Sequence, residues 1–232
     1  DPQSLINNTV YAITQDKKEN YWLATWGGLA AFTANKKFIS YSNNHPLTKY
    51  LYSIIYLKNS NCLLTSGPNG IFKFDLSNKQ WQPCADKTGF LKNNTIVGRY
   101  FLSANDSTVW IATEGLGLVR YNHVAGVFSK INPVYAIAHN TRHIFSENNM
   151  LWIGSDNGLI LYDAQSNKVT RRWTSKEGLP NNVIYAILKD KNAKLWLSTN
   201  NGLSCFDPLT GNFKNYDAGY GLQGMEFNTA CC

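Results

Sequence analysis

Hydrophobic residues occur along this chain in short runs, separated by clusters rich in Gly, Asn, Asp, Lys and Ser. Runs of this length, bounded by turn-forming residues, are typical of β-strands. No run places apolar residues at the i, i+3 and i+4 spacing of a long amphipathic helix. The pattern therefore predicts an all-β protein built from many short strands.

One stretch of sequence occurs five times, most clearly at residues 151–163 and 195–207, and also at 21–33, 61–75 and 109–122. Each copy has a large apolar residue, then Thr or Ser, a polar turn, Gly followed by Leu or Ile, and an aromatic residue. The first column contains Trp22, Cys62, Trp110, Trp152 and Trp196, and the second contains Thr25, Thr65, Thr113, Ser155 and Thr199. A repeat of about 40 to 48 residues with four strands is typical of a propeller blade.

Within each repeat the four strand-length runs become more polar from the first to the fourth. This order predicts a β-propeller of four-stranded antiparallel blades, with the first strand innermost and the fourth at the outer edge. The blades are expected at residues 1–41, 42–85, 86–131, 132–174 and 175–217. Residues 221–232 are expected to begin a further blade, so that the five repeats form part of a larger propeller of about seven blades.

The first strand of each blade is expected to carry a small residue, because innermost strands crowd around the axis of a propeller. These strands are predicted at residues 10–13, 51–54, 96–99, 134–137 and 184–187. Their small residues are Ala12, Ser53, Gly98, Ala136 and Ala186. The glycine between the second and third strands, as at Gly158 and Gly202, is expected to adopt a positive φ in a tight turn.

Composition agrees with this fold and excludes some functions. Aromatic residues make up 13% and charged residues 16% of the chain, which favours a sheet-rich globular protein over disorder. The net charge is +7, but the basic residues are spread over turns and outer strands rather than interleaved with aromatics in one groove. We therefore expect no nucleic-acid binding by this region. The odd number of cysteines does not indicate a disulfide framework.

No motif of a hydrolase elbow, a phosphate-binding loop or a zinc protease is present. His139 and His143 are interpreted as residues of a solvated turn between a first and a second strand, and no metal site, catalytic residue or cofactor is expected. Glu114, Asp156 and Glu177 could act together on a glycosidic bond only if the fold placed two of them close to each other. The region is therefore predicted not to be an enzyme.

The tryptophans of the repeat are interpreted as packing between blades rather than as sugar-stacking residues. Trp26 differs, because it replaces a small polar residue of a turn. The Asn-Asn pairs precede first strands, where amides could bind sugar hydroxyls as well as form turns. The candidate ligand-binding residues are Trp26, Asn8, Asn94, Glu114, Asp156, Asn182 and Asn200.

Three segments carry a family resemblance: Leu-Trp-Ile-Gly-Ser-Asp-Asn-Gly-Leu at 151–159, Gly-Leu-Pro-Asn-Asn-Val-Ile-Tyr-Ala-Ile at 178–187, and Asp-Pro-Leu-Thr-Gly-Asn-Phe at 207–213. They resemble the two-component regulator propeller repeats in the sensor regions of hybrid two-component systems of Bacteroidetes such as Bacteroides. The segment 221–228 is similar to the start of the last blade in that family. The resemblance covers essentially the whole chain, although the chain holds only part of one propeller.

This resemblance implies a periplasmic region of two propellers and a small β-sandwich, followed by a membrane segment, a histidine kinase, receiver domains and a DNA-binding domain. It implies that the region senses a glycan or oligosaccharide and regulates polysaccharide-utilisation genes. The implied partners are an oligosaccharide, the remaining blades and the C-terminal sandwich of the same protein, and a second copy in a homodimer formed through the full sensor. The alternatives are a propeller scaffold for protein–protein interaction and a propeller glycoside hydrolase or lyase.

Overall fold

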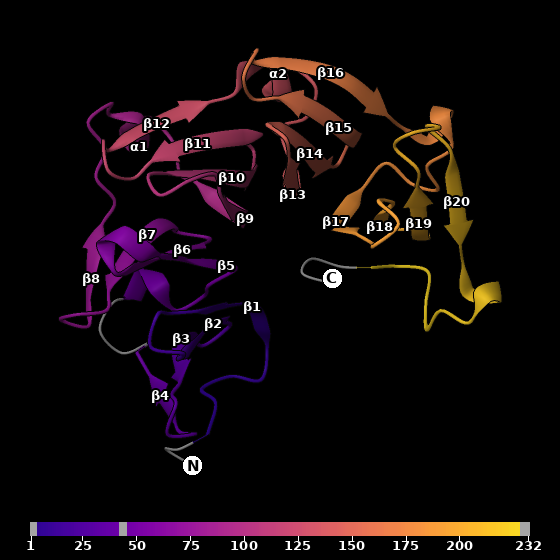
Figure 1. Cartoon of the computed structure of the whole chain (residues 1–232). Helices are drawn as coiled ribbons and strands as arrows, with labels where there is room; N and C mark the ends of the chain where they lie inside the picture. Colours follow the sequence, from indigo (N-terminus) through magenta and orange to yellow (C-terminus); the bar gives the residue numbers. More distant parts are fainter. Residues whose placement is uncertain (1–3, 42–45, 228–232) are drawn as a thin grey trace. The chain divides into compact units, whose positions relative to one another are not determined.

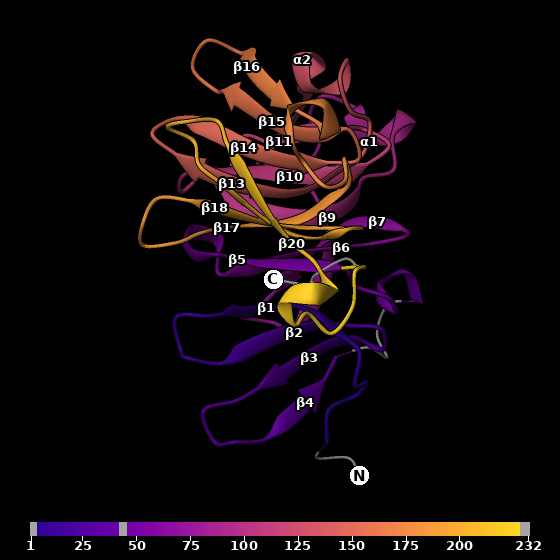
Figure 2. The same ribbon diagram turned by 90° about the vertical axis from the view of Figure 1, so that its right-hand side faces the viewer.

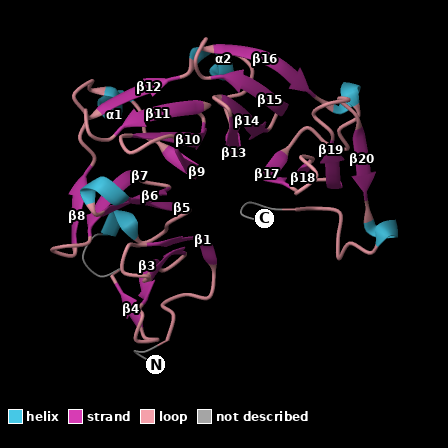
Figure 3. Cartoon of the chain, viewed as in Figure 1, coloured by secondary structure: helices cyan, strands magenta, loops and turns pink. Residues whose placement is uncertain are grey.

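The computed structural model describes residues 4–41 and 46–227 of the chain. In this part the strands form five four-stranded antiparallel sheets, which confirms the all-β class (Figure 1). In each sheet the strands lie in chain order, as Figures 1 and 2 both show for β1 to β4. The helices are short and lie between strands, apart from a 3-10 turn after the last strand (Figure 3). We number the sheets as blades 1 to 5.

The bounds of the strands and helices follow chain order. Blade 1 comprises β1 (Val10–Gln15), β2 (Tyr21–Thr25), β3 (Gly28–Phe32) and β4 (Phe38–Ser40). Blade 2 comprises β5 (Ser53–Leu57), β6 (Cys62–Gly67), β7 (Gly70–Asp75) and β8 (Gln80–Pro83), and blade 3 comprises β9 (Val97–Ser103), β10 (Thr108–Glu114), β11 (Leu118–Asn122) and β12 (Val127–Lys130). Blade 4 comprises β13 (Thr141–Glu147), β14 (Met150–Ser155), β15 (Gly158–Asp163) and β16 (Lys168–Trp173), and blade 5 comprises β17 (Ile184–Lys189), β18 (Leu195–Thr199), β19 (Gly202–Phe206) and β20 (Phe213–Tyr216). The helices are α1 (Phe90–Asn93) and α2 (Asn132–Tyr135), with 3-10 turns η2 (Pro46–Thr48), η3 (Lys58–Ser60), η4 (Ser175–Glu177) and η5 (Ala218–Tyr220).

The chain forms two compact units. The first contains blades 1 and 2 and most of blade 3, and the second contains residues 112–118, the tip of a blade 3 hairpin, together with blades 4 and 5. In each unit the core lies between consecutive sheets. Trp22 is buried among residues of blades 1 and 2, and Trp152 among residues of blades 4 and 5. These two members of the tryptophan column therefore pack between blades, as the sequence predicts.

The turn between the second and third strands is held in the same way in several blades. The Thr25 hydroxyl donates to the Gly28 carbonyl over 2.8 Å, and the Ser155 and Thr199 hydroxyls make the same bond at 2.7 and 2.9 Å. The glycine that follows has a positive φ, as predicted for Gly158 and Gly202. The Thr and Ser residues of the second column thus stabilise the turn between the second and third strands.

Small residues are required where innermost strands approach each other. In the first unit Ser53 Oγ donates to the Gly98 carbonyl, and the Gly98 N–H donates to Ser66 Oγ over 2.7 Å. A Cβ on Gly98 would come within 3.1 Å of side chains of Ser66 and Ile111. The close approach of Ser66 and Ile111 to Gly98, and the hydrogen bond from Ser53 to its carbonyl, therefore explain the small residues in β5 and β9.

The first strand predicted at residues 134–137 is wrong. Residues 132–135 form α2, and the innermost strand of blade 4 is β13, seven residues later. Pro133 lies in the first turn of α2, where its missing N–H and fixed φ suit a helix start and not a central strand. His143, not Ala136, therefore occupies the small-residue position, and its cross-strand partner is Gly154, where a Cβ would come within 2.9 Å of the Ile184 side chain of β17.

The alignment of the second repeat is also wrong, by two residues. Gly67 pairs with Gly70 across a two-residue turn, just as Thr25 pairs with Gly28. Trp22 lies three places before Thr25, and the residue three places before Gly67 is Leu64. Leu64, not Cys62, therefore belongs to the tryptophan column. The hydroxyl that binds the Gly70 carbonyl is that of Ser66, not of Thr65. Cys62 and Cys205 are buried free thiols, as is Cys84, whose pKa is raised by burial to about 12; Cys231 and Cys232 lie outside the described residues.

Candidate functional site

An exposed aromatic cluster lies at one end of blade 1, where the β2–β3 turn meets the start of β1. The ring of Trp26, 42% exposed, lies 5.8 Å from that of Tyr11, 4.9 Å from that of Tyr50 and 6.2 Å from that of Tyr52. Tyr11 also meets Tyr52 edge to face at 5.6 Å. We call these four residues the Trp26 platform, and all of them belong to the first unit.

Two cations flank the Trp26 platform. The Arg99 guanidinium lies 4.6 Å from the centre of the Tyr52 ring, and Lys49 Nζ lies 5.5 Å from that of Tyr50. Cations at this distance from a ring face are attracted by the π-electrons. The Trp26 platform therefore presents aromatic faces beside positive charge.

The local backbone explains why Trp26 stands out from the sheet. The Trp26 N–H donates to the Thr9 carbonyl over 3.0 Å, and the Gly27 N–H donates to Thr25 Oγ1, also over 3.0 Å. A Cβ on Gly27 would come within 2.9 Å of the Asn7 side chain. The turn is therefore pressed against the segment before β1, and the indole is directed outward.

A β-bulge near the start of the first strand sets the direction of a second group of side chains. The pairing register shifts between Val10 and Ala12 in β1, and at the matching places in β13 and β17. The extra residue of a bulge leaves the regular ladder and re-aims its side chain. The bulged residues are Tyr11, Arg142 and Tyr185.

These residues, together with Tyr50, Tyr52 and Arg99, are not among the candidates predicted from the sequence. One feature of the sequence indicates three of these tyrosines: a tyrosine directly precedes the small residue of three first strands, at positions 11, 52 and 185. Arg142 gave no such signal, because the first strand of its blade was placed seven residues too early.

Of the residues predicted in the first unit, Trp26 belongs to the aromatic cluster. Asn8 is exposed and adjacent to Thr9, whose carbonyl binds the Trp26 N–H. Asn94 has a different role, because its side-chain amide donates to the Phe90 carbonyl over 2.9 Å and thereby closes α1.

In the second unit, Asp156 is the centre of a polar network at the β14–β15 turn. Its carboxylate accepts hydrogen bonds from Arg142 Nε at 2.5 Å and Asn140 Nδ2 at 2.9 Å. Asn140 Oδ1 in turn accepts from the N–H of Gly115, the residue after Glu114. The Arg142 guanidinium lies 4.7 Å from the centre of the Tyr185 ring. The network thus links Asp156 to the backbone beside Glu114, whose own side chain is exposed.

Asn182 and Asn200 occupy turns of the second unit. Asn182 Oδ1 accepts from the Ser175 N–H over 2.8 Å, and the backbone carbonyl of Asn182 accepts from the Gly158 N–H. Asn182 thus connects η4 to the β14–β15 turn. Asn200 Oδ1 is buried and makes no hydrogen bond with any described residue. The predicted residues are therefore divided between the two units, with Trp26 and Asn8 in one group and Asp156 and Glu114 in another.

The prediction of a solvated turn for the histidines is wrong for His143. It lies in β13 and is buried, whereas His139 is exposed and stacks on Tyr135 with the ring centres 4.4 Å apart. Burial lowers the pKa of His143 from 6.5 to about 4. Within the described residues, no group of three or more His, Cys, Asp or Glu side chains could hold a metal ion.

Acid is expected to destabilise the protein through His143. The folded state takes up a proton only near pH 4, while the unfolded chain does so near the ordinary pKa of 6.5, so the unfolded state binds more protons between these values. The free energy of unfolding should therefore fall as the pH drops through this window, by about 3 kcal/mol in total. Urea unfolding measured across the window should show this slope in the wild type and in His139→Gln, and lose it in His143→Ser. An unchanged slope in His143→Ser would contradict the assignment.

Comparison with known proteins agrees with this architecture. A family model described as "Two component regulator propeller" matches residues 4–27, which include β1 and β2, and residues 178–201, which include β17 and β18. No curated protein matches the chain. None of the helices in the described ranges is long and apolar enough to cross a membrane.

Three solved structures show the same fold. The extracellular domain of a putative hybrid two-component system from B. thetaiotaomicron is 23% identical, with a TM-score of 0.75 over 91% of this chain and 30% of that chain. A second such domain from the same organism is 22% identical, with a TM-score of 0.60 over 94% of this chain and 32% of that one. Streptogramin B lyase is 13% identical, with a TM-score of 0.65 over 92% of this chain and 70% of that enzyme.

The chain is thus a β-propeller protein. It carries two-component regulator propeller repeats, as predicted from the sequence, and shares its fold with extracellular domains of hybrid two-component systems. It spans about a third of the length of those two domains. Propellers of this fold also include a lyase, so the fold alone does not decide whether the chain is an enzyme.

Proposed function

We propose that the chain is a non-catalytic, ligand-binding part of an extracytoplasmic sensor region, and that it binds an oligosaccharide on the Trp26 platform. The observation that carries this proposal is the exposed indole, which lies among three tyrosine rings with Arg99 and Lys49 beside them. Aromatic faces offer large, rigid contact area to the apolar face of a sugar ring. The guanidinium and the ammonium would favour sugars that carry carboxylate or sulfate groups.

The repeat family, and the fold that the chain shares with extracellular domains of two-component systems, support a sensor role. In a longer periplasmic protein of this kind, with a histidine kinase beyond the membrane, occupancy would regulate polysaccharide-utilisation genes. Binding can act as a signal only if the ligand prefers one arrangement of the sensor over another. The Trp26 platform combines residues of blade 1 with two tyrosines of the segment before β5, and Arg99 of β9 flanks it, so a bound sugar would favour one packing of these sheets.

The alternative of a propeller hydrolase or lyase has less support from the residues. A general acid needs a carboxyl group that can reach the oxygen of the bond to be cleaved. Both oxygens of Asp156 are instead engaged within the protein, Oδ1 by Arg142 Nε and Oδ2 by the Asn140 amide. This geometry suits a structural ion pair between β13 and the β14–β15 turn.

Thermal unfolding with neutral, uronate-bearing and sulfated oligosaccharides tests the proposal. At least one class should raise the midpoint of the wild type by mass action. Trp26→Ala should weaken binding of that class by about tenfold or more, because a large aromatic anchor is lost. Trp26→Phe should retain part of the affinity, and Arg99→Gln should weaken binding of charged sugars more than of neutral ones.

The matched control is Tyr220→Ala, which removes an exposed ring of the second unit, outside the Trp26 platform. It should bind sugars as the wild type does. An unmoved wild-type midpoint with every sugar, or the same rise in Trp26→Ala as in the wild type, would refute the proposal.

A further inference from the structure

Asparagine is followed by glycine in the turn between the second and third strands of blades 2, 4 and 5. The three pairs are Asn69-Gly70, Asn157-Gly158 and Asn201-Gly202. An asparagine in this setting can lose its side-chain amide without a catalyst, because a glycine nitrogen is the least hindered nucleophile that a backbone offers. The chain therefore has three candidate sites for the same reaction, at the same place in three blades.

The three turns share one restraint on the asparagine. Each side-chain amide donates to a backbone carbonyl in the segment before the first strand of its own blade, and we call this bond the amide latch. The latches join Asn69 to Leu47 over 3.1 Å, Asn157 to Ile137 over 2.8 Å and Asn201 to Pro180 over 3.3 Å. The three glycines are also all buried, so each pair can react only when its turn opens locally.

The glycines differ in the hydrogen bonds that such an opening has to break. The Gly158 N–H donates to the Asn182 carbonyl over 2.8 Å, and the Gly202 N–H donates to the Met225 carbonyl over 2.6 Å. Among the described residues, the Gly70 N–H makes no backbone hydrogen bond outside its own sheet. The Gly70 turn therefore opens with one hydrogen bond fewer to break than either of the other turns.

Packing around the glycines differs in the same direction. A Cβ at Gly158 or Gly202 would lie 2.1 Å from the carbonyl oxygen of the last residue of the fourth strand, so both turns are pressed against that strand. At Gly70 the nearest atom to such a Cβ is Thr95 Cγ2, at 3.9 Å. The backbone of Gly70 thus lacks the contact that fixes the other two, and the side chain before it, that of Asn69, is exposed.

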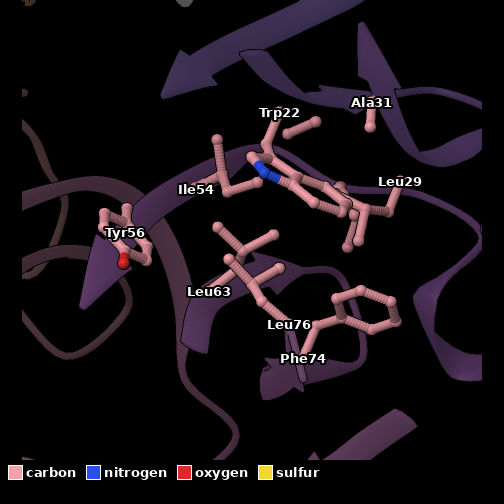
Figure 4. Close-up of a cluster of buried hydrophobic side chains, with 10 residues drawn as sticks. Trp22, Leu29, Ala31, Ile54, Tyr56, Leu63, Phe74 and Leu76 are labelled. Carbon is pink, nitrogen blue, oxygen red and sulfur yellow. The ribbon is translucent and has the colours of Figure 1, made fainter. Parts of the chain in front are cut away.

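Opening of this turn leaves the rest of blade 2 in place. Ser66, which precedes the turn, is bound to blade 3, because its Oγ accepts from the Gly98 N–H over 2.7 Å. Toward the other end of the hairpin, Phe74 packs against Trp22 in the seam between blades 1 and 2, with ring centres 5.8 Å apart (Figure 4). The opening is therefore confined to the turn and costs less than unfolding of the blade.

We propose that Asn69 is a site of spontaneous deamidation, and that the reaction loosens the segment 46–52 from the β6–β7 turn. The Gly70 nitrogen loses its proton and attacks the side-chain carbonyl carbon of Asn69. The new N–C bond closes a succinimide ring, and the C–N bond of the side chain breaks as ammonia leaves with the proton. Water then opens the ring at either carbonyl, which leaves aspartate or isoaspartate.

The product cannot hold the segment as asparagine does. An ionised carboxylate has no hydrogen to donate, so the latch to the Leu47 carbonyl is lost. The N–H groups of Leu51 and Tyr52 in this segment donate to backbone carbonyls of blades 1 and 2, over 3.1 and 2.7 Å. We expect these two bonds to open more often after deamidation. The proposal does not rest on sugar binding, although the segment also supplies two tyrosines of the Trp26 platform.

Peptide mapping by mass spectrometry tests the site. In the folded wild type, held at mildly alkaline pH, Asn69 should be converted about tenfold faster than Asn157 or Asn201, because one hydrogen bond fewer has to break. In urea the three sites should react at similar rates, because the fold no longer distinguishes them. The control Asn69→Gln should show no conversion at position 69 and unchanged rates at the other two sites. Equal rates at the three sites of the folded protein would overturn the proposal.

Amide hydrogen exchange tests the loosening of the segment. Asn69→Asp has the side chain of the aspartate product, and its Leu51 and Tyr52 N–H groups should exchange about fivefold faster than those of the wild type. The matched control is Asn157→Asp, which makes the same change in the second unit and should leave the exchange of Leu51 and Tyr52 unaltered. Unchanged exchange in Asn69→Asp would contradict the proposed loosening.

Discussion

Replacing Trp22 with alanine is expected to lower the free energy of unfolding by about 3–5 kcal/mol. The indole is buried between blades 1 and 2, in contact with Tyr41 and Phe74, so its removal leaves a cavity that these rings cannot fill. Its N–H also donates to Asp16 Oδ2 over 2.8 Å, and the substitution leaves that carboxylate without one of its donors. Urea unfolding at neutral pH measures the loss.

Two further substitutions separate packing from hydrogen bonding. Trp22→Phe keeps an aromatic ring in the seam and removes the N–H, so it should cost about 1–3 kcal/mol. Trp26→Ala removes the same side chain from an exposed turn and should change the free energy of unfolding by less than about 1 kcal/mol. Equal losses for Trp22→Ala and Trp26→Ala would contradict the assignment of the tryptophan column to packing between blades.

Gly158→Ala is expected to cost about 3 kcal/mol or more, through two effects that add. Gly158 has φ 99°, a conformation that alanine adopts only with strain. A Cβ at this position would also lie 2.1 Å from the Trp173 carbonyl oxygen, so the β15–β16 pairing would have to move. Chemical unfolding of the variant measures the sum of both effects.

Gly70→Ala provides the matched control, because Gly70 holds the same turn position in blade 2. Its φ is 115°, but the nearest atom to a Cβ there is Thr95 Cγ2 at 3.9 Å, which is ordinary contact. This substitution should cost only about 1–2 kcal/mol, from backbone strain alone. If the two variants lost the same stability, the collision with the Trp173 carbonyl would not matter.

The fold was predictable because the repeated residues perform backbone and packing tasks that every blade shares. Gly158 and Gly202 are needed for positive φ, and Trp22 and Trp152 fill the seams, so periodic sequence reflects periodic structure. The misplaced first strand at 134–137 shows the limit of pattern alone. Its Val-Tyr-Ala-Ile sequence is that of residues 10–13, but Pro133 directs it into a helical turn.

The candidate site was predictable only in part. Trp26 was found because a large aromatic residue in a tight turn departs from the repeat. Tyr11 and Arg142 are directed by bulges, and a bulge depends on how two strands pair rather than on either strand alone. The pairing of Asp156 with Arg142 and Asn140 depends likewise on contacts between strands that the repeat pattern does not specify.

The bulges have a consequence for how such a protein can diversify. Tyr11, Arg142 and Tyr185 occupy equivalent places in three blades, and their side chains leave the ladder that holds each sheet together. Exchange of one of them alters the surface at the end of its blade and its contact with a residue of the next blade, such as that of Arg142 with Tyr185, but leaves the aromatic packing between blades and the turn glycines unchanged. Substitutions at these places can therefore diversify this surface, while the propeller continues to fold from the same repeat.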